Sequence, residues 1–99
     1  MTINKKLEGT ELTIELEGRL DTTTAPDLEA EVKASTAGLT KLVLDLEKLE
    51  YMSSAGLRVL LSTQKSMTAQ GGELVVRKVN ETIMEVFEVT GFSDILTIE

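Results

Sequence analysis

The sequence contains no cysteine and no histidine. The missing cysteine excludes disulfide bonds, thiolate nucleophiles and cysteine metal sites. The missing histidine removes the commonest metal ligand and the usual proton shuttle near neutral pH. Triad hydrolysis, zinc chemistry and histidine-based acid–base catalysis need these side chains. We therefore expect a protein that is not an enzyme and that uses no metal ion and no cofactor.

The sequence also has few aromatic residues, no excess of positive charge and no long apolar run. One tyrosine, two phenylalanines and no tryptophan provide no stacking platform for single-stranded nucleic acid. A formal net charge of −7 repels nucleic acids and anionic lipids. No apolar run approaches the ~18 residues of a membrane span, and residues 1–6 lack the apolar segment of a signal peptide. The sequence predicts a cytoplasmic protein without membrane insertion, monomeric when free, whose partner is another protein.

The length of the chain predicts one domain over residues 1–99. Its composition, with 41% hydrophobic and 27% charged residues, is near that of an ordinary globular domain. Alternating apolar runs at 3–7 and 12–16 predict a hairpin with one face in water. Continuous apolar runs at 42–44 and 74–76 are typical of strands covered on both faces. A short last strand is expected within 95–98.

Helices are expected between these strands. Thr24 and Asn80 are candidate N-caps, and Gly91 is a candidate helix stop. The clearest helix starts near Ser54, and its predicted buried stripe contains Leu57, Leu60 and Leu61. Strands separated by helices pair in parallel through right-handed crossovers. We therefore predict an α/β fold: a mixed sheet with an N-terminal hairpin, then parallel βα units, with helices packed on it.

Loops that follow the carboxyl ends of parallel strands converge at one end of such a sheet, where ligands usually bind. Residues 21–25, 45–54 and 77–80 are expected to form these loops. They carry hydroxyls and small side chains, which suit the docking of a partner loop or a phosphate. The candidate binding residues are Asp21, Thr22, Thr23, Ser53, Ser54, Ala55 and Gly56, and the third loop brings the basic pair Arg77 and Lys78.

Ser54 is the focal residue, and it has two interpretations. It directly precedes an amphipathic helix, so its side chain can simply cap the first turn. Its small neighbours instead leave the backbone accessible to a partner, and Gly56 indicates either a close approach or a glycine tolerated at a helix end. Asp21 has the same ambiguity, because an aspartate here can cap the turn that follows it.

Two stretches resemble the STAS domain family. Gly18-Arg19-Leu20-Asp21 resembles the glycine-x-aliphatic-aspartate signature at the end of that family's second strand. Residues 42–46, followed by Tyr-Met-Ser-Ser-Ala-Gly-Leu-Arg-Val-Leu at 51–60, are similar to its third strand, phosphorylation loop and second helix. The resemblance covers nearly the whole chain.

The resemblance implies a bacterial anti-sigma-factor antagonist. Such a protein binds an anti-sigma factor that is also a serine kinase, and thereby releases a sigma factor. The kinase phosphorylates the serine that matches Ser54, and a serine phosphatase reverses the modification. The family often has aspartate directly before this serine, whereas this chain has Ser53, which makes Ser53 a rival acceptor. Two alternatives are a STAS subunit that braces the ATPase of a lipid-transport ABC system, and a small-ligand-binding α/β domain.

Overall fold

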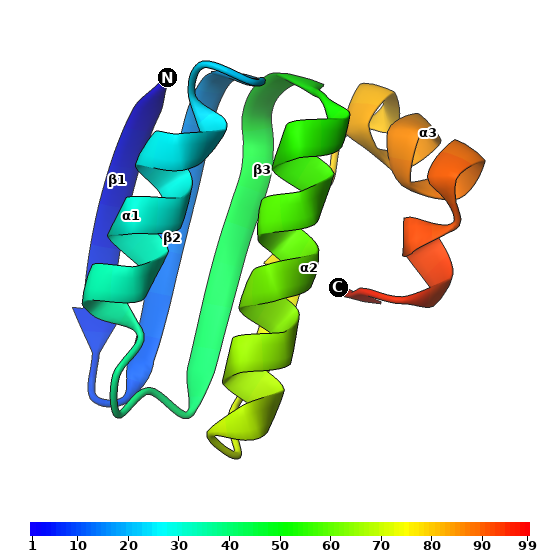
Figure 1. Ribbon diagram of the computed structural model, residues 1–99. Helices are drawn as coiled ribbons and strands as arrows, with labels where there is room; N and C mark the ends of the chain where they lie inside the picture. The colour runs from blue at the N-terminus through cyan, green and yellow to red at the C-terminus, as the bar shows by residue number, and fades with distance from the viewer.

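Five strands form one sheet in the order β1-β2-β3-β4-β5 in the computed structural model, which describes residues 1–99 (Figure 1). Strand β1 (Thr2–Glu8) pairs antiparallel with β2 (Glu11–Leu20). Strands β3 (Lys41–Met52), β4 (Glu73–Arg77) and β5 (Thr97–Ile98) each pair in parallel with the strand before them. The predicted hairpin followed by parallel units is confirmed.

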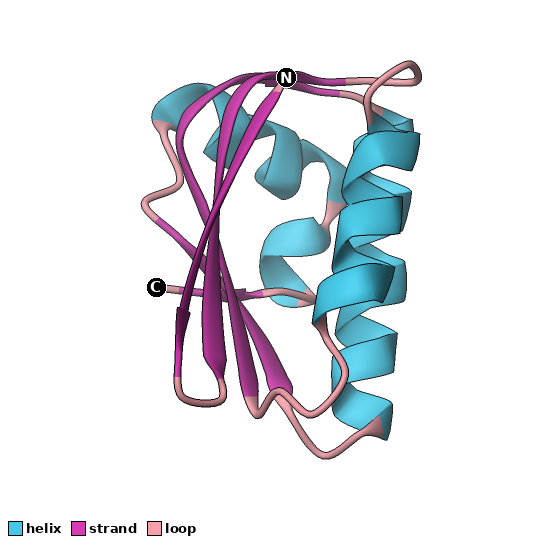
Figure 2. Cartoon of the chain, turned by 90° about the vertical axis from the view of Figure 1, so that its left-hand side faces the viewer, coloured by secondary structure: helices cyan, strands magenta, loops and turns pink.

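The parallel strands are connected by α1 (Ala25–Ser35), α2 (Ser54–Ala69), and α3 (Glu81–Thr90) with the 3-10 turn η1 (Phe92–Asp94). Because the strand order follows the sequence in one direction, successive right-handed crossovers return on the same side of the sheet. Figure 2 shows the two long helices together on one side. None of the helices has the length and apolarity needed to cross a lipid bilayer.

The apolar runs of β3 and β4 are buried on both faces of the sheet, as predicted, although α1 and α2 cover only one face (Figure 2). Leu42 and Leu44 belong to the core cluster of 22 buried residues, whereas Val43 and Val75 are buried outside it. Side chains alternate along a strand, so these two valines point to the face opposite α1 and α2. Lys41 lies on that face, with its Nζ 3.9 Å from carboxylate oxygens of Glu11 and Glu73. Aliphatic stems of such charged side chains can shield apolar surface from water.

Helix α2 packs its apolar stripe on the sheet, with one correction. Leu57 and Leu60 are buried as predicted, but Leu61 is only half-buried. The buried stripe instead includes Val59, because α2 lies beside α1 as well as on the sheet.

The predicted role of Asn80 as the N-cap of α3 is confirmed, and its side chain also binds the backbone of β3. Its Oδ1 accepts the Ile83 N–H at 3.0 Å. Its Nδ2 donates to the carbonyl oxygens of Leu46 at 3.1 Å and Leu49 at 2.8 Å. Strand β4 has already ended at this level of the sheet, so Asn80 occupies backbone acceptors of β3 that a strand would otherwise use. Gly91 ends α3 in the left-handed conformation, with φ 81°, as predicted.

Candidate functional site

The carboxyl ends of β2 and β3 lie side by side. Leu20 pairs with Met52 in the parallel ladder, and the Ser53 N–H donates to the Leu20 carbonyl oxygen at 2.9 Å. The loop after β2 therefore meets the start of α2 at one end of the sheet, the upper end in Figure 1. Two of the three predicted loops converge as expected.

The third predicted loop lies elsewhere. Strand β4 ends at Arg77, which pairs with Asp45, while β3 continues to Met52. Most of segment 45–54 is thus strand and not loop, because β2 extends to Leu20 and gives β3 a partner beyond the end of β4. Lys78 Nζ lies 3.8 Å from carboxylate oxygens of Asp45 and Glu47. The basic pair Arg77 and Lys78 therefore lies beside Asp45 in the middle of β3, and not at the end of β3 where Ser54 follows.

The two adjacent serines differ in accessibility. Helix α2 begins at Ser54, so Ser53 takes the N-cap position that was expected for Ser54. Ser53 makes no side-chain capping bond, and its Oγ is buried without a hydrogen-bond partner. Ser54 is exposed. The expected capping role of Ser54 is therefore wrong, and its hydroxyl is the one that solvent reaches.

The start of α2 carries unpaired backbone donors. The Leu57 N–H donates to the Ser53 carbonyl oxygen at 3.1 Å, which is the first bond of the helical ladder. The preceding N–H groups, from Ser54 to Gly56, have no carbonyl partner within the helix. They form the positive end of the helix dipole beside the Ser54 hydroxyl, an environment that favours negative charge.

Asp21 organises the loop after β2. Its Oδ1 accepts hydrogen bonds from the Thr23 hydroxyl at 2.7 Å, the Thr23 N–H at 3.0 Å and the Thr24 N–H at 3.2 Å. The bond from the Thr23 hydroxyl is the largest cause that holds the pKa of Asp21 below its usual value, and partial desolvation opposes it. The predicted capping of the turn is thus observed. Thr24 takes the predicted N-cap position of α1, but its Oγ1 donates to the Arg19 carbonyl oxygen instead.

Gly56 is buried, and the close approach that it permits is internal. A Cβ at this position would lie 2.7 Å from Leu20 Cγ and 3.1 Å from Met52 Cγ. The glycine therefore lets α2 lie close to β2 and β3, and it is not available for a partner. The exposed candidates at this end are Thr22, Thr23 and Ser54, with Ala55 half-buried beside them.

Arg19 and Tyr51 also lie at this end of the sheet. The sequence predicted no contact between them, and both occur only within the stretches that resemble the family. They pair across β2 and β3, and the Arg19 guanidinium lies 4.3 Å from the centroid of the Tyr51 ring. The Arg19 Nε is also 3.7 Å from Asp21 Oδ2. No pattern in the sequence signals this contact, since it depends on the register between two strands.

The chemistry available here is that of a docking surface with one accessible hydroxyl. No group of three or more His, Cys, Asp or Glu residues is placed to hold a metal ion. Ser54 can accept a covalent phosphate, Asp21 is held as a carboxylate, and the Thr22 and Thr23 side chains lie beside them at the surface.

Comparison with known proteins gives one consistent family. The sequence pattern of the STAS domain matches residues 2–99. BtrV of Bordetella bronchiseptica, named as a candidate anti-sigma factor antagonist, is 42% identical over 84 residues, which are 84% of this chain and 72% of that protein. The anti-sigma-B factor antagonist of Bacillus subtilis is 28% identical over 98 residues, 99% of this chain and 90% of that protein.

A solved structure has the same fold. The Bacillus cell fate determinant SpoIIAA in its phosphorylated form superposes with a TM-score of 0.77 at 19% identity. The match covers 99% of this chain and 91% of that one.

Proposed function

The chain belongs to the STAS domain family, and we propose that it acts as an anti-sigma-factor antagonist controlled by phosphorylation of Ser54. In its unmodified form it binds an anti-sigma factor that is also a serine kinase, and so releases a sigma factor. The kinase transfers phosphate to Ser54, and a serine phosphatase removes it. The names of the two relatives support this role over an ABC-transporter subunit and over a small-ligand-binding domain.

The contrast between the two serines carries the proposal. A kinase must bring the attacking hydroxyl to the terminal phosphate of ATP, so the acceptor has to be accessible. Ser54 is exposed, whereas the Ser53 Oγ is enclosed. This favours Ser54 as acceptor even though the residue before it is not the aspartate that the family often has.

The helix start explains how the folded protein tolerates the modification. A phosphate on Ser54 adds about −1.5 to −2 charges at pH 7. It would stand beside the unpaired N–H groups of the first turn of α2, which favour an anion. We therefore infer that phosphorylation leaves the fold unchanged and acts at the interface, where the partner would have to desolvate a dianion.

The proposed contact surface consists of the accessible residues around Ser54. Thr22, Thr23 and Ala55 flank the serine, and Asp21 either contacts the partner or holds the loop that does. Ser53 and Gly56 support this surface from below, through the bond to Leu20 and the close packing of α2. The protein is a binding module in this proposal, monomeric when free and acting in the cytoplasm.

The test is a phosphorylation assay with the cognate anti-sigma kinase and MgATP, followed by mass-spectrometric mapping. Wild type and Ser53→Ala should each carry phosphate on Ser54, and Ser54→Ala should remain unmodified while it still binds the kinase. Ser53→Ala is the matched control, because it removes the neighbouring hydroxyl only. Phosphate on Ser53 alone, or full kinase binding by the phosphorylated protein, would contradict the proposal.

A further inference from the structure

Two basic side chains lack a carboxylate partner, although the protein has a net charge of −7. Of the ten Lys and Arg residues, all but Arg58 and Lys65 form ion pairs. The paired residues are Lys5, Lys6, Arg19, Lys33, Lys41, Lys48, Arg77 and Lys78. The positive charge of Arg58 and Lys65 is thus not neutralised within the fold.

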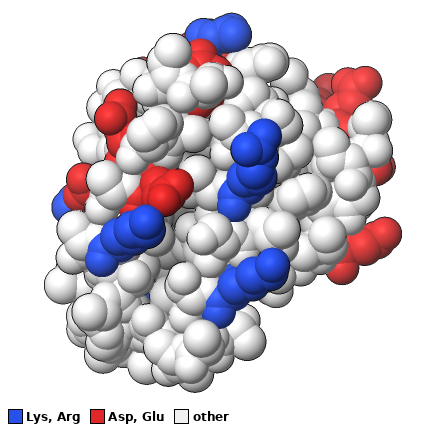
Figure 3. Space-filling model, in the orientation of Figure 1, with Lys and Arg blue, Asp and Glu red and all other residues white.

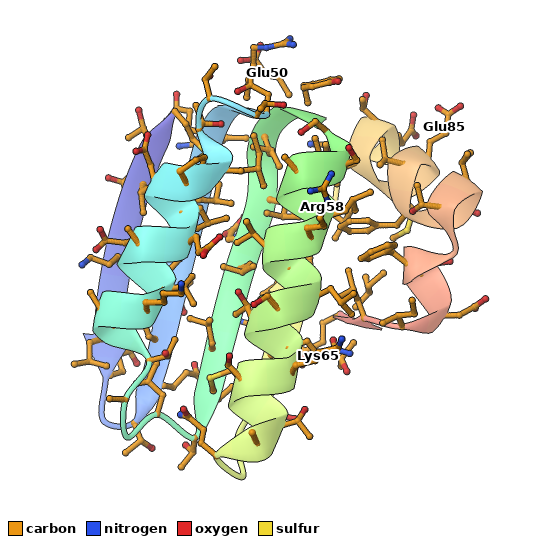
Figure 4. The ribbon with its side chains drawn as sticks, viewed as in Figure 1. Glu50, Arg58, Lys65 and Glu85 are labelled. Atoms are coloured by element: carbon orange, nitrogen blue, oxygen red, sulfur yellow. The ribbon has the colours of Figure 1, made fainter.

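Both side chains lie on the same face of α2. They are seven positions apart in the sequence, which is about two helical turns and roughly 10 Å along the axis. Figure 4 shows Arg58 on the upper part of the helix and Lys65 below it. Figure 3, in the same orientation, shows basic side chains among uncharged atoms on this face.

A groove of about 600 Å³ between α1 and α2 is lined by both cations. Hydroxyl groups of Thr22, Ser62 and Ser66 line the same groove. Its one carboxylate, Glu29, is engaged by Lys33 with an Nζ–Oε1 distance of 2.9 Å. The groove is therefore rich in hydrogen-bond donors for an anion and carries positive charge that Glu29 does not cancel.

The groove is continuous with the surface around Ser54. Thr22 and Ala55 line it, and both belong to the proposed contact surface. A protein seated at Ser54 can therefore extend along α2 into the groove without leaving the surface.

We propose that this groove binds an acidic segment of the same partner protein that docks at Ser54, an inference that rests on the proposed function. The guanidinium of Arg58 can hold a carboxylate through two parallel hydrogen bonds, and Lys65 supplies a second point charge. The spacing of the two residues along the axis of α2 is roughly 10 Å. It matches carboxylates seven residues apart on a helix or three residues apart on an extended segment.

The test measures affinity for the purified cognate anti-sigma kinase, without ATP, at low and at physiological salt. Arg58→Gln with Lys65→Gln removes the two unpaired cations. Lys6→Gln with Lys48→Gln is the matched control, because it removes two exposed cations outside the groove. The groove variant should bind about ten-fold more weakly and lose part of its salt dependence, while the control keeps both.

A second measurement identifies the occupant. A water-soluble carbodiimide joins a lysine amine to a carboxylate in contact with it, and mass spectrometry should find Lys65 joined to Asp or Glu of the kinase. Equal affinity and salt dependence of wild type and the groove variant, or cross-links confined to other lysines, would overturn the groove inference while the proposed function stands. Absence of any binding by wild type would overturn the proposed function.

Discussion

Gly56 and Leu20 are in contact at the junction of α2 and β2. A Cβ on Gly56 would lie 2.7 Å from Leu20 Cγ and 2.9 Å from Leu20 Cδ2. Leu20 is fully buried, so its side chain has little free space into which it could move. The residue next to the Ser54 surface is thus a glycine for reasons of internal packing.

Gly56→Ala should destabilise the protein by about 1–3 kcal/mol, the usual cost of overpacking a filled core. The gain in helix propensity of alanine over glycine, up to ~1 kcal/mol, offsets only part of this cost. Urea denaturation measures the change, and Ser66→Ala, at an exposed position of α2, is the control. An unchanged or higher midpoint for Gly56→Ala would mean that α2 can move away from Leu20.

Leu60→Ala should cost about 2–5 kcal/mol of unfolding free energy, because it leaves a cavity in the core. Leu60 is fully buried. Leu61→Ala removes the same atoms from a half-buried position and should cost clearly less. Denaturant unfolding of the pair checks the register of α2, and equal costs would argue against it.

The lowered pKa of Asp21 predicts that the protein loses stability in acid. Its folded pKa lies below the ordinary value of 3.8, so the charged form contributes stability that is present above pH 3.8 and is lost as the pH falls through the folded pKa. Asp21→Asn should remove this contribution, so its stability should fall less steeply below pH 3.8 than that of wild type. Parallel urea titrations from neutral pH into acid measure the difference, and identical curves would show that the Thr23 and Thr24 bonds are not coupled to folding.

Asp21→Ala also separates the two roles of this carboxylate. If Asp21 contacts the kinase, its removal should weaken binding more than the loss of its hydrogen bonds to Thr23 and Thr24 explains. Calorimetric affinity and thermal melting on the same sample decide the question. A lower melting temperature with unchanged affinity would restrict Asp21 to holding the loop.

Ser54→Asp should reproduce the phosphorylated state at the interface, with lower affinity for the kinase and an unchanged fold. Desolvation of an unpaired charge costs several kcal/mol, and ~1.4 kcal/mol corresponds to ten-fold in affinity, so full phosphorylation should weaken binding about 10³-fold. Calorimetry measures the affinity, and circular dichroism checks the fold. Ser54→Ala, which adds no charge, should bind as wild type does; equal binding by Ser54→Asp would argue against the electrostatic mechanism.

The sequence by itself determined the elements and their order. Alternation in residues 12–16, the apolar runs at 42–44 and 74–76, and the cap at Asn80 are local patterns, and each depends on the nearest neighbours in the chain. The same holds for the position of Ser54 at a helix start. Local patterns therefore sufficed for the parallel topology and for the place of the candidate site.

Tertiary structure alone decided which side chains the site presents. β3 continues to Met52 because β2 is there to pair with it, although residues 47–51 alternate too weakly to indicate a strand. Ser53 and Ser54 are the same residue type, and only packing encloses one hydroxyl and exposes the other. Lys6, Arg19 and Lys33 pair with carboxylates close by in the sequence. The fold brings carboxylates of distant elements to Lys5, Lys41, Lys48, Arg77 and Lys78, and it brings none to Arg58 and Lys65. Burial and ion pairing depend on residues far apart in the sequence, and the fold brings those residues together.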